Sequence, residues 1–305
     1  MKLYYCKYPD GRQNFGDYLN LWLWEKLIPN VLDEDERTAF VGLGTLINDS
    51  LPRRTPRALK RVIFSTGAGY EKGMPDLDDS YRIYCLRGPL SAKAIDMPPE
   101  LGVADGAILV RRLININSRK VHKFAYMPHY NFAGEGWKSV CEQLGFGYID
   151  PSWPTEKVLS SINNTEILLC EAMHGAIVAD ALRVPWIPIV THPTILPFKW
   201  QDWCLSIGVE YQPVPMKRLQ QPRESSGGWA KGSISKKVDI LKTARLARDW
   251  IRQKSASAQL LQIAKTVHPT LSTDTQIERI TVELEERLQK FKDDVEAGYF
   301  SSYTT

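Results

Sequence analysis

Short apolar segments alternate with stretches of helical periodicity over the first 118 residues of the chain. In the stretch that follows Gly16, apolar side chains recur three or four residues apart, which predicts a helix with one buried face. A second helix is expected to start at Pro89, because proline suits the first helical turn. The segments expected to form strands are residues 3–8, 40–44, 62–65 and 83–86. Strands that alternate with helices predict a parallel sheet covered by helices.

The alternation begins again after the polar segment 115–120. The expected strands are residues 123–127, 147–149, 166–170 and 186–190, and the expected helices are residues 135–144, 154–162 and 173–182. A second α/β unit predicts two Rossmann-like domains that face each other across a cleft, with ligands beyond the carboxyl ends of the strands. We therefore expect an N-terminal domain at residues 1–118 and a C-terminal domain at residues 119–254.

The end of the chain has a different pattern. Residues 221–232 are rich in proline, serine and glycine, which predicts an exposed loop. Residues 255–305 are expected to form a C-terminal helical extension. It carries one apolar stripe at helical spacing, made of Ile277, Ile280, Leu284, Leu288 and Phe291. Such a stripe predicts a helix that packs on the protein's own core.

Composition narrows the class of protein. Of 305 residues, 43% are hydrophobic and 24% are charged, as in ordinary globular proteins. No apolar segment reaches the ~18 residues of a membrane span, and no signal peptide is recognisable. The five cysteines are scattered without a CxxC pair, which argues against a zinc site or a disulfide framework. We therefore expect a reduced, cytoplasmic protein.

The charge of the chain says less about its class and its binding partners than the composition does. The net charge of +4 is too small to indicate a nucleic-acid partner. Residues 216–254 hold eleven basic and three acidic side chains. This basic segment is expected to be a solvated face, and it also suits peripheral contact with an anionic membrane surface or a charged glycan.

Six clusters of residues that could take part in binding or catalysis follow predicted strands. They are residues 14–17, 42–45, 65–69, 87–91, 127–130 and 171–175. Glycine turns such as those at Gly42 and Gly67 let the backbone approach an anion, or they simply allow a tight turn. The Gly42–Gly44 pair lacks the third glycine of a dinucleotide fingerprint, which disfavours a nicotinamide cofactor. The sequence contains no P-loop and no GxSxG motif.

Four side chains in these clusters are candidates for chemistry. Arg87, between a strand and a helix, could grip a carboxylate or phosphate with two hydrogen bonds, or pair with a nearby carboxylate. His174 opens an apolar helix, where the helix dipole favours a neutral imidazole that can act as a base. Glu171 could orient His174 or accept its proton, and His129 holds the equivalent place after an earlier strand. Nothing marks these residues as a metal site, and none is predicted.

Taken in order, these motifs resemble the polysaccharide pyruvyl transferase family, in particular its exopolysaccharide branch. The segments that carry the resemblance are residues 14–17, the Gly42 and Gly67 turns, 87–91, 105–107, 127–129, 171–176 and 199–203. The resemblance implies a fold like that of two-domain glycosyltransferases of the GT-B type. It also implies transfer of pyruvate from phosphoenolpyruvate onto two hydroxyls of a sugar, which forms a cyclic ketal. Phosphoenolpyruvate is then a donor substrate, and no cofactor is expected.

The resemblance also suggests roles for individual residues. The family associates an arginine after a first-domain strand, and an Arg-Leu-His cluster, with donor binding; Arg87 and His174 match the first arginine and the histidine. Ala172 and Met173 stand where the cluster's arginine and leucine would be, so Lys199, Arg183 or backbone amides would have to supply the missing charge. The expected catalytic residues are His174, Glu171, Arg87 and His129. The expected donor-binding residues are Arg87, His174, Gly175, Lys199, Gly67 and Gly69, and the expected acceptor-binding residues are Asn14, Asp17, Gly44 and Thr45.

Two other functions remain open from the sequence. A glycosyltransferase that uses nucleotide sugars could share the architecture, because one fold hosts many chemistries. A non-catalytic glycan-binding subunit could stack sugars on tryptophans, although core packing is the favoured prediction for Trp22, Trp24, Trp200 and Trp203. The acceptor is expected to be a glycan or its lipid-linked precursor, met in the cytoplasm or at the inner face of the membrane.

Overall fold

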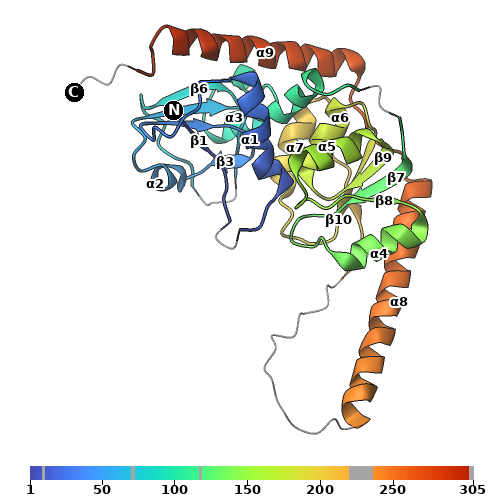
Figure 1. The fold of residues 1–305 in the computed structure, drawn as a ribbon. Coiled ribbons are helices and arrows are strands. Elements are labelled where there is room, and N and C mark those ends of the chain that lie inside the picture. The colour runs from blue at the N-terminus through green and yellow to red at the C-terminus, as the bar shows by residue number, and fades with distance from the viewer. Residues whose placement is uncertain (9–10, 70–72, 117–118, 220–235, 302–305) are drawn as a thin grey trace.

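The computed structural model describes residues 1–8, 11–69, 73–116, 119–219 and 236–301, with the side chains of residues 236–249 left out. Two parallel sheets lie side by side (Figure 1). The first sheet has the order β1-β2-β4-β6 and consists of β1 (Lys2–Tyr4), β2 (Thr38–Val41), β4 (Lys60–Phe64) and β6 (Tyr81–Cys85). The second has the order β11-β10-β9-β7-β8 and consists of β7 (His122–Met127), β8 (Gly147–Tyr148), β9 (Thr165–Cys170), β10 (Trp186–Val190) and β11 (Val214–Pro215).

This arrangement confirms an α/β protein built on parallel sheets. Strands such as β2 are buried along their whole length, as expected for a parallel sheet covered on both faces. The expected strand at residues 3–8 is shorter, because β1 pairs with β2 only over Lys2–Tyr4. A two-stranded pair, β3 (Thr45–Ile47) with β5 (Gly67–Ala68), was not expected from the sequence.

Helices connect and cover the strands (Figure 1). In the first part of the chain they are α1 (Phe15–Leu27), α2 (Leu51–Arg54), α3 (Pro89–Ala94) and the 3-10 helices η1 (Pro99–Leu101) and η2 (Gly106–Arg112). Around the second sheet they are α4 (Glu135–Leu144), α5 (Thr155–Asn163), α6 (Met173–Ala181) and α7 (Pro197–Ser206). The last two are α8 (Lys236–Thr266) and α9 (Asp274–Glu296). The loop expected at residues 221–232 lies outside the described residues, and the side chains of most of the basic segment, residues 220–249, are not described.

One hydrophobic core runs from the first sheet to the second. It joins Phe40 and Trp24 beside the first sheet, the apolar residues 107–110 of η2, and Trp186 and Trp203 beside the second sheet. The preference for core packing of the tryptophans is confirmed for Trp24, Trp200 and Trp203, which are fully buried. Because η2 packs on both α6 and α9, it joins the two sheets through apolar contacts.

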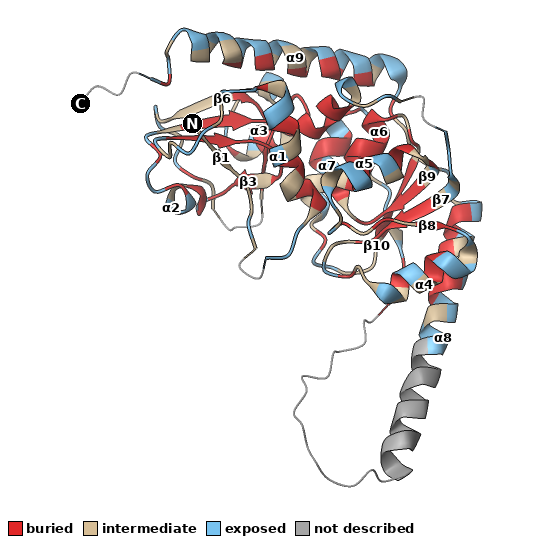
Figure 2. Ribbon diagram, viewed as in Figure 1, coloured by how far each residue is buried: buried red, intermediate tan, exposed pale blue. Residues whose placement is uncertain are grey.

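The C-terminal helix α9 lies across the top of the molecule (Figure 2). All five residues of its apolar stripe are buried, as expected. Phe291 packs against Phe40 and Tyr84 of the first sheet, with ring centroids 5.3 and 5.4 Å apart. The start of α9 is held near the second sheet, where Asp274 pairs with Arg183 at 2.8 Å. Within the part of the chain that the structure describes, no helix is long and apolar enough to cross a bilayer.

Candidate active site

A cavity of about 330 Å³ lies where the carboxyl ends of the two sheets meet. Ligands bind at this position in parallel α/β sheets, because loops from several strands converge there. Of the residues expected from the sequence, the cavity is lined by Asn14, Asp17, Gly44, Thr45, His129, His174 and Lys199. Segments from both halves of the chain therefore build one site.

Asp17 forms part of the wall from the first half of the chain. It lies in the first turn of α1, and its Oδ2 accepts hydrogen bonds from Asn14 Nδ2 at 2.6 Å and from the Tyr8 hydroxyl at 3.3 Å. Burial raises its pKa to about 6, although these two bonds and the charge of Lys199 act in the opposite direction. Asp17 is thus a carboxyl group whose protonation changes close to neutral pH.

His174 projects from the second half of the chain, in the first turn of α6 directly after β9. Its Nε2 lies 3.6 Å from Oδ2 of Asp105, and both atoms are buried without a hydrogen bond. The opposite ring nitrogen packs against Gly16, where an added Cβ would fall 2.1 Å from Nδ1. Gly16 therefore makes room for the imidazole between α1 and α6.

The environment of His174 keeps its ring neutral. Burial lowers its pKa to about 3, with a further contribution from the positive charges of Lys199 and Arg87. Burial also raises the pKa of Asp105 to about 6. Asp105 is fixed as the cap of η2, since its Oδ1 accepts the Ala107 N–H at 3.0 Å. At 3.6 Å the two atoms form no hydrogen bond, but a negative Asp105 beside Nε2 would stabilise a protonated imidazole by its charge, with Nδ1 as the atom that accepts the proton.

Glu171 makes no hydrogen bond to His174 in this structure, and its expected part in catalysis stays a prediction. Its Oε2 accepts the His129 N–H at 3.0 Å, and its Oε1 accepts the Thr191 N–H at 2.8 Å and the Thr191 hydroxyl at 2.5 Å. These bonds tie together the loops that follow β7, β9 and β10. Glu171 therefore supports the second half of the cavity from behind and does not line it.

His129 is the second histidine of the cavity. Its ring packs against Tyr130 and Phe132, with centroids 4.6 and 5.5 Å apart. Burial lowers its pKa to about 4, and the nearby charges of Lys199 and His192 lower it further. Two neutral imidazoles thus face one cavity, each a candidate to accept a proton.

Lys199 and Arg54 bring positive charge to the cavity. Lys199 lies in the first turn of α7, close enough to Asp17, His129 and His174 to change the pKa of each. Arg54 ends α2 and was not recognised from the sequence, where it looks like one of several surface arginines. Arg183, the other candidate for the missing family arginine, lies elsewhere and donates to Ser272 O at 2.6 Å.

Arg87 lies behind the cavity, and its predicted contact with the donor stays untested. The guanidinium is fully buried, and its Nε pairs with Asp202 Oδ2 at 3.0 Å. Its Nη1 donates to Thr45 Oγ1 at 2.6 Å and to Gly44 O at 3.2 Å. Thr45 and Gly44 line the cavity, so Arg87 in this structure positions the cavity wall.

The glycines expected to bind the donor also stand behind the lining. A Cβ at Gly67 would fall 2.2 Å from Arg87 Cζ, so this glycine makes room for the arginine. A Cβ at Gly175 would fall 2.5 Å from the sulfur of Met127, so this glycine serves packing. Gly69 has a φ of +134°, which an L side chain rarely adopts, and belongs to the turn after β5.

No group of three His, Cys, Asp or Glu side chains able to hold a metal ion occurs among the described residues. The histidines, Asp17 and the cations that line the cavity offer proton transfer and anion binding. The lining suits a small anionic ligand bound next to a second ligand that carries hydroxyl groups.

Comparison with known proteins gives one relevant relative. The chain is 40% identical over 217 residues to the succinoglycan biosynthesis protein ExoV of Rhizobium meliloti (strain 1021). The matched region covers 70% of this chain and 67% of that protein. No family model and no solved structure matches the chain.

Proposed function

The chain belongs to the polysaccharide pyruvyl transferase family of exopolysaccharide biosynthesis, and from this premise we propose that it transfers pyruvate from phosphoenolpyruvate onto two hydroxyls of a glycan sugar. The observation that carries the proposal is one cavity with two neutral histidines, Lys199 and Arg54 at the carboxyl ends of both sheets. A small trianionic donor needs the cations, and its reaction with hydroxyls needs the proton acceptors.

The proposed reaction balances without a cofactor. The oxygen of one acceptor hydroxyl bonds to C2 of phosphoenolpyruvate, while a proton is added to C3 and turns the methylene into a methyl group. The second hydroxyl then bonds to C2, and the C2–O bond to phosphate breaks with its electron pair on the leaving phosphate. One hydroxyl proton ends on the methyl group and the other on phosphate. The products are inorganic phosphate and a cyclic ketal that carries a carboxylate.

Lys199 and Arg54 are proposed to bind the carboxylate and phosphate of the donor, which would explain how the site works without the family arginine before His174. Charge-assisted hydrogen bonds of this kind are the strong ones in anion sites. The bound anion would in turn raise the pKa of both histidines, because a negative charge nearby favours the protonated imidazole.

His174 is proposed to take the proton of the attacking hydroxyl at Nδ1, with the charge of the Asp105 carboxylate, 3.6 Å from Nε2, stabilising the imidazolium. Asp17 is the proposed proton donor to C3, because its pKa of about 6 leaves part of it protonated near neutral pH. His129 is a second candidate for proton transfer. Each of these steps is typically worth about 10²–10⁴-fold in rate.

We propose further that the two sheets form facing halves of a GT-B-like fold, divided at residues 1–118, 119–254 and 255–305. The acceptor would be an exopolysaccharide chain or its lipid-linked precursor, and the protein would work in the cytoplasm or at the inner face of the membrane. Neither a metal nor nucleic acid has a part in the proposed reaction.

Calorimetric titration with phosphoenolpyruvate tests the donor. We expect saturable binding by the wild type and a loss of about 10–100-fold in affinity for Lys199→Met, since a hydrogen bond to a charged group contributes about 1.5–3 kcal/mol. His174→Asn should keep donor binding and lose phosphate release by about 10²–10⁴-fold. Lys138→Met, an exposed lysine on α4, is the matched control.

Nucleotide sugars are the decisive competitor ligands. Binding of UDP- or GDP-sugars in place of phosphoenolpyruvate would overturn the proposal in favour of a glycosyltransferase. Glycan binding with neither donor would overturn it in favour of a non-catalytic subunit. A methyl singlet from the ketal in the NMR spectrum of the product would identify the reaction directly.

A further inference from the structure

A second and larger cavity, of about 850 Å³, runs along β1, an edge strand of the first sheet. It is lined by residues 2–8 and 54–57 together with Glu36 and Ala39, and we name it the β1 groove. Cys6, Tyr8 and Arg54 line both this groove and the candidate active site. The two cavities are therefore neighbours that share one wall.

The two cavities differ in size: the smaller one suits the reacting groups, and the larger one suits neighbouring units of a polymer. The active-site cavity of about 330 Å³ is at the lower end of the ~300–1,000 Å³ typical of small-molecule sites. It would have to hold the donor and two hydroxyls of the reacting sugar. Sugars next to the reacting one must leave that cavity, and the β1 groove opens directly beside it.

Three tyrosines within five residues line the β1 groove, namely Tyr4, Tyr5 and Tyr8, and each is half-buried. Tyrosine offers a flat apolar face with a hydroxyl at its edge and loses little conformational entropy on binding. These are the properties needed to pack on the C–H face of a sugar and to hydrogen-bond its hydroxyls. Tyr8 connects the groove to the active site, since its hydroxyl donates to Asp17 at 3.3 Å.

The charge of the groove favours an anionic ligand. Its lining holds four basic side chains, Lys2, Lys7, Arg54 and Arg57, and one acidic side chain, Glu36. Glu36 pairs with Lys2 and Arg57, both at 3.1 Å, and Glu34, which is outside the lining, pairs with Lys2 at 2.8 Å. Lys7 is exposed and lies over the ring of Tyr5, 5.0 Å from its centroid. Positive charge next to aromatic rings suits a glycan that bears carboxylates.

We propose that the β1 groove binds the sugar units of the acceptor that adjoin the reacting sugar, with a preference for chains that carry acidic groups. The proposal rests on the proposed function for the identity of the acceptor. It deepens that function, because it makes the enzyme selective for the length and charge of the glycan. A single sugar would fill the active site only.

The test measures binding to succinoglycan from which acid-labile substituents have been removed, cut into fragments from one sugar to several repeats. Lys7→Glu and Tyr5→Ala change residues that line the groove and not the active site. We expect each to weaken binding of long fragments by about tenfold or more, with single-sugar binding and phosphoenolpyruvate binding unchanged. Lys138→Glu, with the same charge change on exposed α4, is the control and should change none of these.

The outcomes separate this proposal from the proposed function. Equal affinity of the wild type and both groove variants for long fragments, or no gain in affinity with fragment length, would overturn the groove proposal while phosphoenolpyruvate binding stands. Loss of long-fragment binding in the variants of a protein that binds no phosphoenolpyruvate would uphold the groove and overturn the pyruvyl transfer. Because Tyr5 also packs on Tyr18, Lys7→Glu decides the matter if Tyr5→Ala fails to fold.

Discussion

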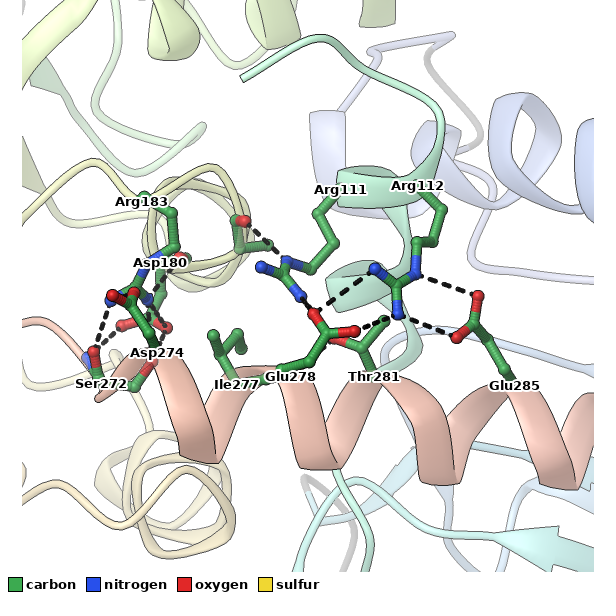
Figure 3. Close-up of polar contacts among 11 residues, drawn as sticks. Arg111, Arg112, Asp180, Arg183, Ser272, Asp274, Ile277, Glu278, Thr281 and Glu285 are labelled. Carbon is green, nitrogen blue, oxygen red and sulfur yellow. Dashed lines mark hydrogen bonds and ion pairs between the residues drawn. The ribbon is translucent and has the colours of Figure 1, made fainter. Parts of the chain in front are cut away.

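Two of the places where an arginine joins segments distant in the sequence differ in their access to water. Near the candidate active site, Arg87 pairs with Asp202 of α7, and both side chains are fully buried. Under α9, Arg112 of η2 pairs with Glu278 at 2.5 Å and with Glu285 at 3.0 Å (Figure 3). There Arg112 is 35% exposed and the two glutamates are 48% and 44% exposed.

The comparison indicates that what an ion pair contributes to stability depends more on its burial than on the distance between its nitrogen and oxygen atoms. Burying Arg87 and Asp202 carries a large desolvation penalty, which only a full set of partners offsets. Arg87 has that set in Asp202, Thr45 and two carbonyls, and Asp202 also accepts the Ser91 hydroxyl at 2.5 Å and its N–H at 2.9 Å. The Arg112 cluster is exposed to water, so its ion pairs add little to the stability of the fold.

The largest effect is expected at the buried pair. Arg87→Met should lower the free energy of unfolding by about 3–5 kcal/mol, because it leaves Asp202 buried without its cation. Asp202→Leu should lower the free energy of unfolding by a similar amount, because it leaves Arg87 buried without its carboxylate. The measurement is urea unfolding followed by circular dichroism.

The double variant Arg87→Met/Asp202→Leu sharpens this expectation. It should recover only part of the loss: no uncompensated charge remains, but the Ser91 N–H and the Gly44 carbonyl lose a partner. Single variants that lose less than about 1 kcal/mol would show that water reaches the pair, and the contrast between the two regions would then fail.

An effect of intermediate size is expected at Asp180, which lies where the start of α9 is anchored (Figure 3). This buried carboxylate accepts the Ser272 N–H at 2.9 Å, the Ser272 hydroxyl, and Trp186 Nε1 at 3.0 Å. Asp180→Ala should lower the free energy of unfolding by about 2–4 kcal/mol, since it leaves buried donors without partners. Thermal unfolding would measure it, and a loss no larger than that of Arg112→Met would contradict the burial argument.

Arg112→Met is expected to have a small effect, below about 1 kcal/mol, because its pairs are exposed. The methionine keeps the apolar stem of the side chain, so the change reports on charge and hydrogen bonding. The difference between the wild type and this variant should shrink further in 1 M NaCl, where the screening length falls to about 3 Å. Denaturant midpoints at low and high salt would measure both effects, and a salt-independent difference would argue against surface pairing.

The smallest effect concerns pH. Hydrogen bonds from Arg112 and then Arg111 hold the pKa of Glu278 below its ordinary value of 4.5. A carboxylate with a lower pKa in the folded state stabilises the fold above pH 4.5, and that contribution is lost as the pH falls through the folded pKa. The stability difference between the wild type and Glu278→Gln should therefore begin to shrink near pH 4.5 and vanish once the pH is below the folded pKa, whereas a difference that persists there would contradict it.

Local patterns were enough to predict much of the fold. Segments such as β9 and α4 could be predicted because their periodicity and flanking turns depend only on neighbours in the sequence. The 3-10 helix η2 could not, because its apolar residues are stabilised by contacts with α6 and α9. The stripe on α9 predicted a buried face, but it did not say that the first sheet would be its partner.

The site was also predictable only in part, namely as far as it depends on the order of strands and loops. Loops after parallel strands were expected to converge, and His129, His174, Asp17 and Lys199 do line one cavity. Which carboxylate lies beside His174 depends on how η2 packs, so Asp105 was missed although its motif was noted. The sequence does not reveal that Asp202, 115 residues away, pairs with the Arg87 guanidinium.

The contact of Phe291 with Phe40 and Tyr84 also constrains the order in which the protein can fold during synthesis. The strands of the first sheet leave the ribosome more than 180 residues before α9 does. At about 5–20 residues per second, the face of the sheet that α9 covers waits roughly 10–40 s for its last helix. During that interval a nascent chain presents aromatic side chains to solvent, so we expect the first half to become stable only after translation of the C-terminal helix.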